Sequence, residues 1–93
     1  MDIAKYDEVF EQAIKGYGLP AQTMKAVEEC SEYINAFAKI SCGRSTAQDV
    51  IDEIADVTIM MRQMALAFGK DEVEKRIKFK VERLKNRMGV FNQ

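Results

Sequence analysis

Apolar residues recur every three or four positions along almost the whole chain, the spacing that gives a helix one apolar face. The first such segment runs from Ile3 to Tyr17, with Asp2 placed to cap its start. The second begins at Pro20, a residue that suits a first helical turn, and extends to about residue 41. The first half of the chain is therefore expected to form a short helix followed by a long one.

The second half opens on a strong signal for a helix start. Ser45 or Thr46 can act as the N-cap of a third helix, and Gln48 or Asp49 can complete a capping box with it. Apolar spacing then continues to about residue 68, where a glycine follows. We therefore expect a second long helix, joined to the first by a short turn.

A fourth helix is predicted over about residues 71–88, with Asp71 at its start. The apolar stripes of the three later helices are expected to form the core: Met24, Val27, Ser31, Ile34 and Ala38; Val50, Ile54, Val57, Met61, Met64 and Phe68; Val73, Ile77, Val81, Leu84 and Met88. No strand pattern competes with these helices. The expected fold is all-α, a four-helix bundle that forms one domain over residues 1–93.

Length adds one expectation to this picture. A domain of 93 residues buries only about two thirds of the surface that its unfolded chain exposes, so its core is small. We therefore expect a homo-oligomer, a dimer or a tetramer, in which copies cover one another's apolar helix faces.

No apolar run approaches the roughly 18 residues of a membrane span, and the first residues lack the pattern of a signal peptide. A cytoplasmic protein with no membrane partner is expected.

The residue types present limit the chemistry. The chain has no His, which excludes Ser-His catalytic triads and His-ligated zinc sites. Cys30 and Cys42 lie too far apart along one helix to form a disulfide, so free thiols are expected.

Residues 70–93 hold eight bases and four acids, whereas residues 1–69 hold six bases and eleven acids. Such a basic tail suits nucleic acid, and it suits a phosphate ligand or an internal acidic partner equally well.

Acidic residues form two matched pairs on the two long helices. Glu29 and Glu32 are three residues apart on one of them, and Glu53 and Asp56 are three apart on the other. Residues that face each other across an antiparallel hairpin have numbers of constant sum, and both cross-helix pairs add up to 85. The implied turn lies at residues 42–43, within the predicted break between the helices. We therefore expect the four carboxylates at one level of the hairpin.

Four carboxylates at one level repel one another unless a cation lies between them. Oxygen-only ligands select a hard cation, so the quartet is a candidate site for Mg²⁺, or for Mn²⁺. A single Glu on a helix is usually only a solvated surface charge, and it is the matched spacing of two pairs that favours a metal site. A metal held in this way neutralises phosphate oxygens and lowers the pKa of bound water, which removes the need for a His base.

At these residues the chain resembles the MazG-like, all-α nucleoside triphosphate pyrophosphohydrolases, whose hallmark is ExxE followed about two dozen residues later by ExxD. The two motifs here are Glu29-Cys-Ser-Glu32 and Glu53-Ile-Ala-Asp56, and the resemblance covers about residues 20–87. It implies hydrolysis of a nucleoside triphosphate to the monophosphate and pyrophosphate. Magnesium would be held by the acidic quartet, and one of its carboxylates would also orient the attacking water.

The resemblance also implies a role for the basic fourth helix. Lys78 and Arg83 match the basic positions that follow the quartet in the family, and they are expected to bind the substrate phosphates. Gln22 and Lys25 precede the quartet on its first helix, and we expect neither of them to contact the nucleotide. Met60 is expected in the core, although its projection beside the quartet also suits a base pocket.

Alternative functions stay open. A phosphoribosyl-ATP pyrophosphohydrolase has similar acidic motifs but ordinarily carries a Tyr-His segment after ExxD, where this chain has Val57-Thr58-Ile59-Met60. An all-α dUTPase is a further enzymatic option. A non-enzymatic helical interaction or nucleic-acid-binding module would use the basic helix instead, although nucleic acid is the less favoured partner.

Overall fold

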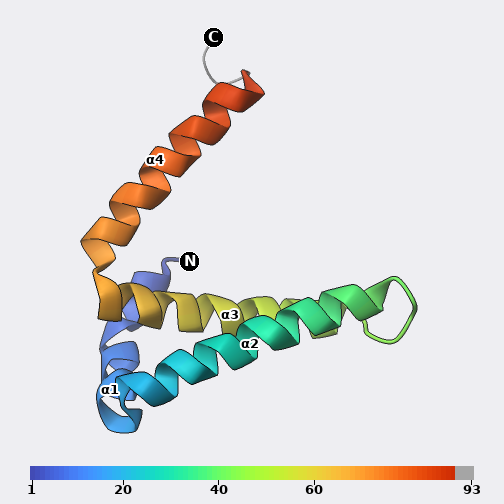
Figure 1. The fold of residues 1–93 in the computed structure, drawn as a ribbon, viewed down its shortest axis with the longest axis horizontal. Coiled ribbons are helices and arrows are strands. Elements are labelled where there is room, and N and C mark those ends of the chain that lie inside the picture. Colours follow the sequence, from blue (N-terminus) through green and yellow to red (C-terminus); the bar gives the residue numbers. More distant parts are fainter. Residues whose placement is uncertain (90–93) are drawn as a thin grey trace.

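The computed structural model describes residues 1–89, which are almost entirely helical (Figure 1). A 3₁₀ turn, η1 (Ile3–Tyr6), is followed by α1 (Asp7–Tyr17), α2 (Leu19–Ile40), α3 (Ala47–Phe68) and α4 (Lys70–Met88). The described residues form no strand, and none of their helices has both the length and the apolar character needed to span a membrane. The predicted all-α class is confirmed.

Two of the predicted helix caps are present. Asp2 accepts a hydrogen bond from the Ala4 backbone N–H at 3.0 Å, but the turn that it caps is 3₁₀, and the α-helix begins only at Asp7. Thr46 and Asp49 form the capping box at the start of α3, each side chain accepting from the other's backbone N–H. These local hydrogen bonds explain why the start of α3 could be read from the sequence.

The junction between α3 and α4 determines the shape of the chain. Gly69 has a φ of +124°, which residues with a side chain rarely adopt, and α4 starts at Lys70 rather than at the predicted Asp71. Beyond this junction α4 leads away from the other helices, and among the described elements it packs against α3 alone (Figure 1). The predicted four-helix bundle therefore needs correction: within one chain α1, α2 and α3 pack together, and α4 stands apart.

The long helices α2 and α3 form an antiparallel hairpin, which is the main packing interaction of the chain. Residues 41–46 connect them, and the Ser45 hydroxyl donates a hydrogen bond to the Ala36 carbonyl, which ties this loop back to α2. α1 packs against both helices at the other end of the hairpin. The acidic pairs therefore lie on two helices that are held in register over their whole length.

The hairpin buries a different face of α2 from the one predicted. Gln22, Ala26 and Glu29 are buried, whereas the predicted core residues Met24, Val27 and Ile34 are 55 to 66% exposed. Small and polar side chains let the two helices approach closely, and this turns the bulky stripe outward. The expected core of α2 is thus wrong for a single chain.

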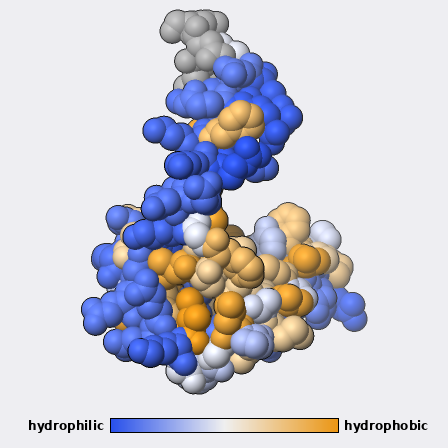
Figure 2. Space-filling view, turned by 60° about the vertical axis from the view of Figure 1, so that its left-hand side comes forward, coloured by the Kyte–Doolittle hydropathy of each residue, from blue (hydrophilic) through white to orange (hydrophobic). Residues whose placement is uncertain are grey.

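Apolar side chains outside the core are numerous. On α3 the predicted core residues Ile54, Met61 and Phe68 are exposed, and on α4 four of the five predicted core residues are exposed as well. The buried apolar residues among those described are Phe10, Ala26, Met60 and Ala65. Figure 2 shows apolar side chains spread over one face of the body formed by α1 to α3, with a smaller patch on the largely hydrophilic α4.

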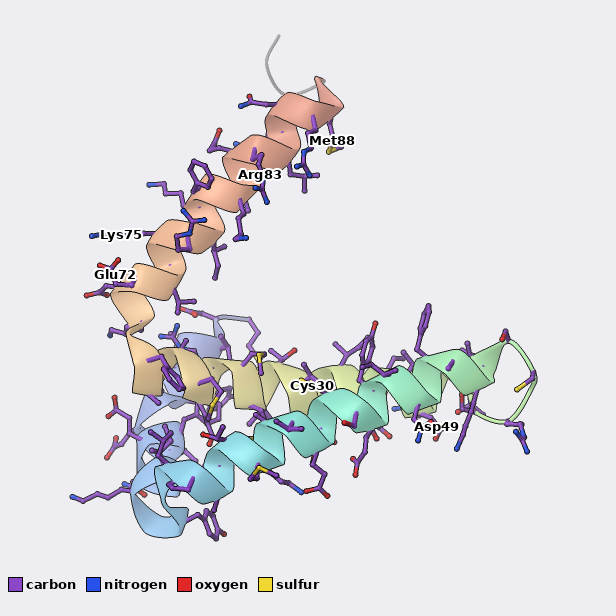
Figure 3. All side chains as sticks on the ribbon, in the orientation of Figure 1. Cys30, Asp49, Glu72, Lys75, Arg83 and Met88 are labelled. Carbon is purple, nitrogen blue, oxygen red and sulfur yellow. The ribbon has the colours of Figure 1, made fainter. Side chains whose placement is uncertain are left out.

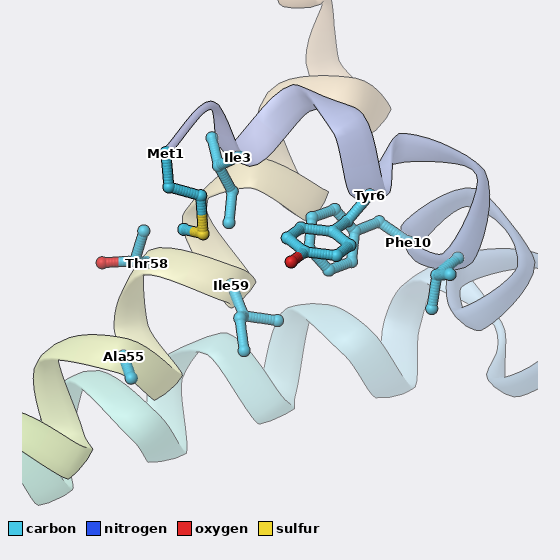
Figure 4. A pocket seen from close by; sticks show the side chains of 8 residues that line it. Met1, Ile3, Tyr6, Phe10, Ala55, Thr58 and Ile59 are labelled. Atoms are coloured by element: carbon cyan, nitrogen blue, oxygen red, sulfur yellow. The ribbon is translucent and has the colours of Figure 1, made fainter.

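The N-terminal segment covers part of α3 loosely. Tyr6 and Phe10 pack ring against ring, with centroids 6.3 Å apart, and Ile3 and Met1 extend over Ile59 (Figure 4). An apolar cavity of about 430 Å³ remains beneath these side chains. Its lining is almost entirely apolar, and the hydroxyl groups of Tyr6 and Thr58 are the polar side-chain groups among the residues that line it.

One partly buried cation, Arg62, joins α3 to α1 and to α4. The Arg62 guanidinium on α3 donates to both carboxylate oxygens of Asp7 on α1, at 2.8 and 2.7 Å. It also reaches Glu74 on α4 at 3.4 Å. The hydrogen bond from Arg62 is the main reason why the pKa of Asp7 lies below its ordinary value of 3.8. Arg62 thus links three helices in a geometry that Lys could not reproduce.

We predict that Asp7→Asn lowers the melting temperature at neutral pH, because it removes the charged partner of Arg62. A lowered pKa in the folded state stabilises the fold above the ordinary carboxyl range, and that contribution is lost as the pH falls through the lowered pKa. The gap between variant and wild type should therefore close in acid. Thermal unfolding followed by circular dichroism measures it, with the exposed Glu11→Gln as the control. Equal melting temperatures at pH 7 would contradict the prediction.

Candidate metal centre

Three acidic side chains converge in the middle of the helical hairpin. Glu29 of α2 is buried, Glu53 of α3 is half-buried, and Asp56 of α3 is exposed. Each offers a carboxylate oxygen that lies within 4.8 Å of an oxygen from the other two. The register inferred from residue spacing thus brings three of the four predicted ligands together.

Glu32, the fourth predicted ligand, borders this group without belonging to it. It lies almost one helical turn beyond Glu29, it is exposed, and its oxygens are outside the group of three. It still senses the group, because the charge of Glu29, then burial and the charge of Glu53, raise the pKa of Glu32.

Two carboxylate oxygens within the group lack a hydrogen-bond partner. They are Oε2 of Glu29 and Oε2 of Glu53, and both are buried. Among the residues described, no other buried side-chain oxygen or nitrogen is left in this state. A buried charged oxygen is costly unless a donor or a cation satisfies it, so these two oxygens are suited to bind a cation.

Burial and mutual repulsion both disfavour the charged forms of these acids. Desolvation, followed by the charges of Asp56 and Glu29, raises the pKa of Glu53. Desolvation and the charge of Glu29 likewise raise the pKa of Asp56. A divalent cation among the oxygens would reverse these effects, because it pairs with the charged forms. The three carboxylates therefore fit a hard cation such as Mg²⁺ or Mn²⁺.

A lysine on α2 already contacts the edge of this group. Nζ of Lys25 lies 3.1 Å from Oε1 of Glu29 and 3.7 Å from Oε2 of Glu28. Its hydrogen bond to Glu29 is the main cause that raises the pKa of Lys25. From the sequence, Lys25 is expected to make no nucleotide contact, although its spacing of four residues from Glu29 is a signal for this ion pair.

The two predicted phosphate-binding residues lie elsewhere. Lys78 and Arg83 are exposed on α4, which leads away from the hairpin, and Figure 3 shows Arg83 on the outer part of that helix. The structure of one chain therefore does not bring either side chain to the carboxylates.

Comparison with models of protein families, with curated proteins and with solved structures finds no match for this chain.

We predict that Glu53→Gln raises the melting temperature of the metal-free chain at neutral pH, because it removes one of the repelling carboxylates. With a raised pKa, the folded state binds a proton more tightly than the unfolded state. Wild-type stability should therefore fall as the pH rises from the ordinary Glu value of 4.5 through the raised pKa. The variant should lack this part of the pH dependence. Thermal unfolding in EDTA across that range measures both effects.

Magnesium should reverse the order of the two proteins. At a free Mg²⁺ concentration 100 times its dissociation constant, wild type should gain about 2.7 kcal/mol, and Glu53→Gln should gain much less. Glu28→Gln, on the same helix as Glu29 but outside the group of three, is the control and should keep the full gain. A wild-type chain whose unfolding ignores Mg²⁺ and Mn²⁺ would rule out the metal centre.

Proposed function

We propose that this protein is a magnesium-dependent pyrophosphohydrolase, which cleaves a nucleoside triphosphate into the monophosphate and pyrophosphate. The observation that carries the proposal is the convergence of Glu29, Glu53 and Asp56. One carboxylate oxygen of Glu29 and one of Glu53 are buried without a hydrogen-bond partner. The resemblance of ExxE and ExxD to the MazG-like motifs supports the same conclusion. A solvated acidic surface would give exposed oxygens that water satisfies.

The chain has the groups that such a reaction requires. Bound Mg²⁺ would neutralise phosphate oxygens and lower the pKa of an attacking water. Glu29, Glu53 and Asp56 would hold the metal, with Glu32 at the edge of the site. One of these carboxylates would orient the water and accept its proton as the water oxygen bonds to phosphorus and the bond to pyrophosphate breaks. A chain without His can perform these steps.

The phosphate-binding role of Lys78 and Arg83 requires a second copy of the chain. α4 leaves its own hairpin uncovered, and its apolar residues Ile77, Val81 and Leu84 are 44 to 55% exposed. Residues 70–93 carry a net charge of +4 and residues 1–69 a net charge of −5, so the helix of one copy complements the body of another. In the homo-oligomer that we propose, α4 covers a neighbour's apolar face and carries its bases to that neighbour's carboxylates.

We predict that Glu53→Gln lowers the rate of pyrophosphate release by at least about a hundredfold, because a metal ligand is lost, while helicity stays unchanged. The assay uses Mg²⁺ and a panel of canonical and modified nucleoside triphosphates that includes dUTP, together with phosphoribosyl-ATP. Glu28→Gln should keep the wild-type rate.

The same panel separates the alternatives. Hydrolysis confined to dUTP or to phosphoribosyl-ATP would reassign the substrate within the same chemistry. A chain that hydrolyses none of these compounds, with or without chelator, would reject the enzyme and favour a binding module built on α4.

A mixing experiment tests the shared site. Glu53→Gln chains and chains with both Lys78→Ala and Arg83→Ala should each be inactive alone. If the bases act on a neighbour, an equal mixture that exchanges subunits recovers about a quarter of wild-type activity in a dimer, because each mixed dimer holds one intact site. Light scattering gives the subunit number. A monomeric mass at micromolar concentration, or no recovery despite exchange, would contradict the shared site.

A further inference from the structure

A second cavity opens beside the carboxylates, where α1, α2 and α3 meet. Its volume is about 510 Å³, which is large enough for a nucleoside. The side chains that give it chemical character are Tyr17, Gln22, Lys25, Met60 and Gln63. Unlike the apolar cavity under the N-terminal segment, it combines buried polar groups with aromatic and aliphatic surface.

Its wall carries a pair of buried amides. Gln22 and Gln63 are only 8% and 5% exposed, and Nε2 of Gln22 donates to Oε1 of Gln63 at 2.7 Å. This hydrogen bond uses the side-chain nitrogen of Gln22 and the side-chain oxygen of Gln63. The side-chain oxygen of Gln22 can still accept a hydrogen bond from a ligand, and the side-chain nitrogen of Gln63 can still donate one. An acceptor beside a donor is complementary to the edge of a nucleobase, where a ring nitrogen lies next to an exocyclic group.

Apolar and aromatic groups frame this polar pair. Met60 is 5% exposed and gives the cavity a buried aliphatic wall. Tyr17 is 75% exposed, so most of its ring is free to stack against a planar ligand. Met60 and Tyr17 thus provide apolar and aromatic surface against which the two faces of a planar base can pack.

Lys25 links the cavity to the carboxylate group. Lys25 lines the cavity and also contacts Glu29 at 3.1 Å. Gln22 precedes Glu29 by seven residues, which is about 10 Å along the helix, and Met60 follows Asp56 by about one turn. A nucleotide whose base enters the cavity would therefore direct its phosphates along Lys25 toward the three acids.

We propose that this cavity is the base pocket of the substrate, and that Gln22 and Gln63 select the nucleobase. The inference rests on the proposed function, since it is the phosphate chemistry that makes a nucleotide the ligand. It revises the expectation that Gln22 and Lys25 make no nucleotide contact. In the orientation present here, the amide pair selects a base that complements the Gln22 oxygen and the Gln63 amide nitrogen. A base with the reverse pattern requires both amides to rotate.

Nucleoside monophosphates test the pocket without turnover. The probes are the four ribo- and four 2′-deoxynucleoside monophosphates with Mg²⁺, added to ¹⁵N-labelled protein while the side-chain amide signals of Gln22 and Gln63 are followed by NMR. At least one base should shift both amide signals in a saturable manner. Gln22→Met together with Gln63→Met replaces both partners by apolar groups of similar size, and it should weaken that binding about tenfold and flatten the preference among bases.

A second variant and a control keep the test independent of folding. Tyr17→Leu changes an exposed side chain and should also weaken binding about tenfold, through lost stacking. Gln12→Met, an exposed residue of α1 outside the cavity, should bind like wild type.

The outcomes separate the two proposals. Amide shifts together with pyrophosphate release support both of them. Amide signals that ignore every monophosphate, in a chain that hydrolyses triphosphates, overturn the pocket and leave the function intact. Saturable shifts in a chain that hydrolyses no triphosphate keep the pocket and reject the reaction. A chain that neither binds nor hydrolyses overturns both.

Discussion

Antiparallel packing of α2 against α3 is the constraint on which the rest of the molecule depends. The two helices run side by side over their length, and their register sets Glu29 opposite Glu53 and Asp56. Carboxylates so placed share a small, partly buried space, where each raises the cost of charging its neighbours. Two of their oxygens are left without a partner. The packing that stabilises the hairpin therefore also brings carboxylates close enough to repel one another, and a bound cation would remove that repulsion.

The same packing explains the unusual distribution of apolar residues. The contact line between the helices holds Gln22, Ala26 and Glu29, whereas the bulkier side chains of Met24 and Ile34 face outward. A polar site lies inside the hairpin, and apolar surface lies outside it. In the proposed oligomer these two features belong together, because the apolar faces bring copies into contact and α4 of one copy supplies phosphate-binding bases to the acidic centre of another. Stability and function would then depend on the same association.

Lys25 connects the two parts of the proposed substrate site. It contacts Glu29 on one side and lines the cavity that contains Gln22 and Gln63 on the other. The carboxylates would act on the phosphate chain, which every nucleotide shares, and the amide pair would read the base, which differs among them. Reaction and selectivity would thus reside in adjacent but separate groups of residues, each held by the same hairpin.

The sequence by itself determined the all-helical class, a capping box at Ser45 or Thr46 and the register that aligns Glu29 with Asp56, because periodicity, caps and turns depend on neighbouring residues. Only the tertiary structure decided which face of α2 is buried, since an apolar stripe serves equally well as a core or as an interface between copies. It alone paired Gln22 with Gln63, 41 residues apart. The direction of α4 was also decided by the tertiary structure, because the backbone conformation of Gly69 sets the angle between α3 and α4.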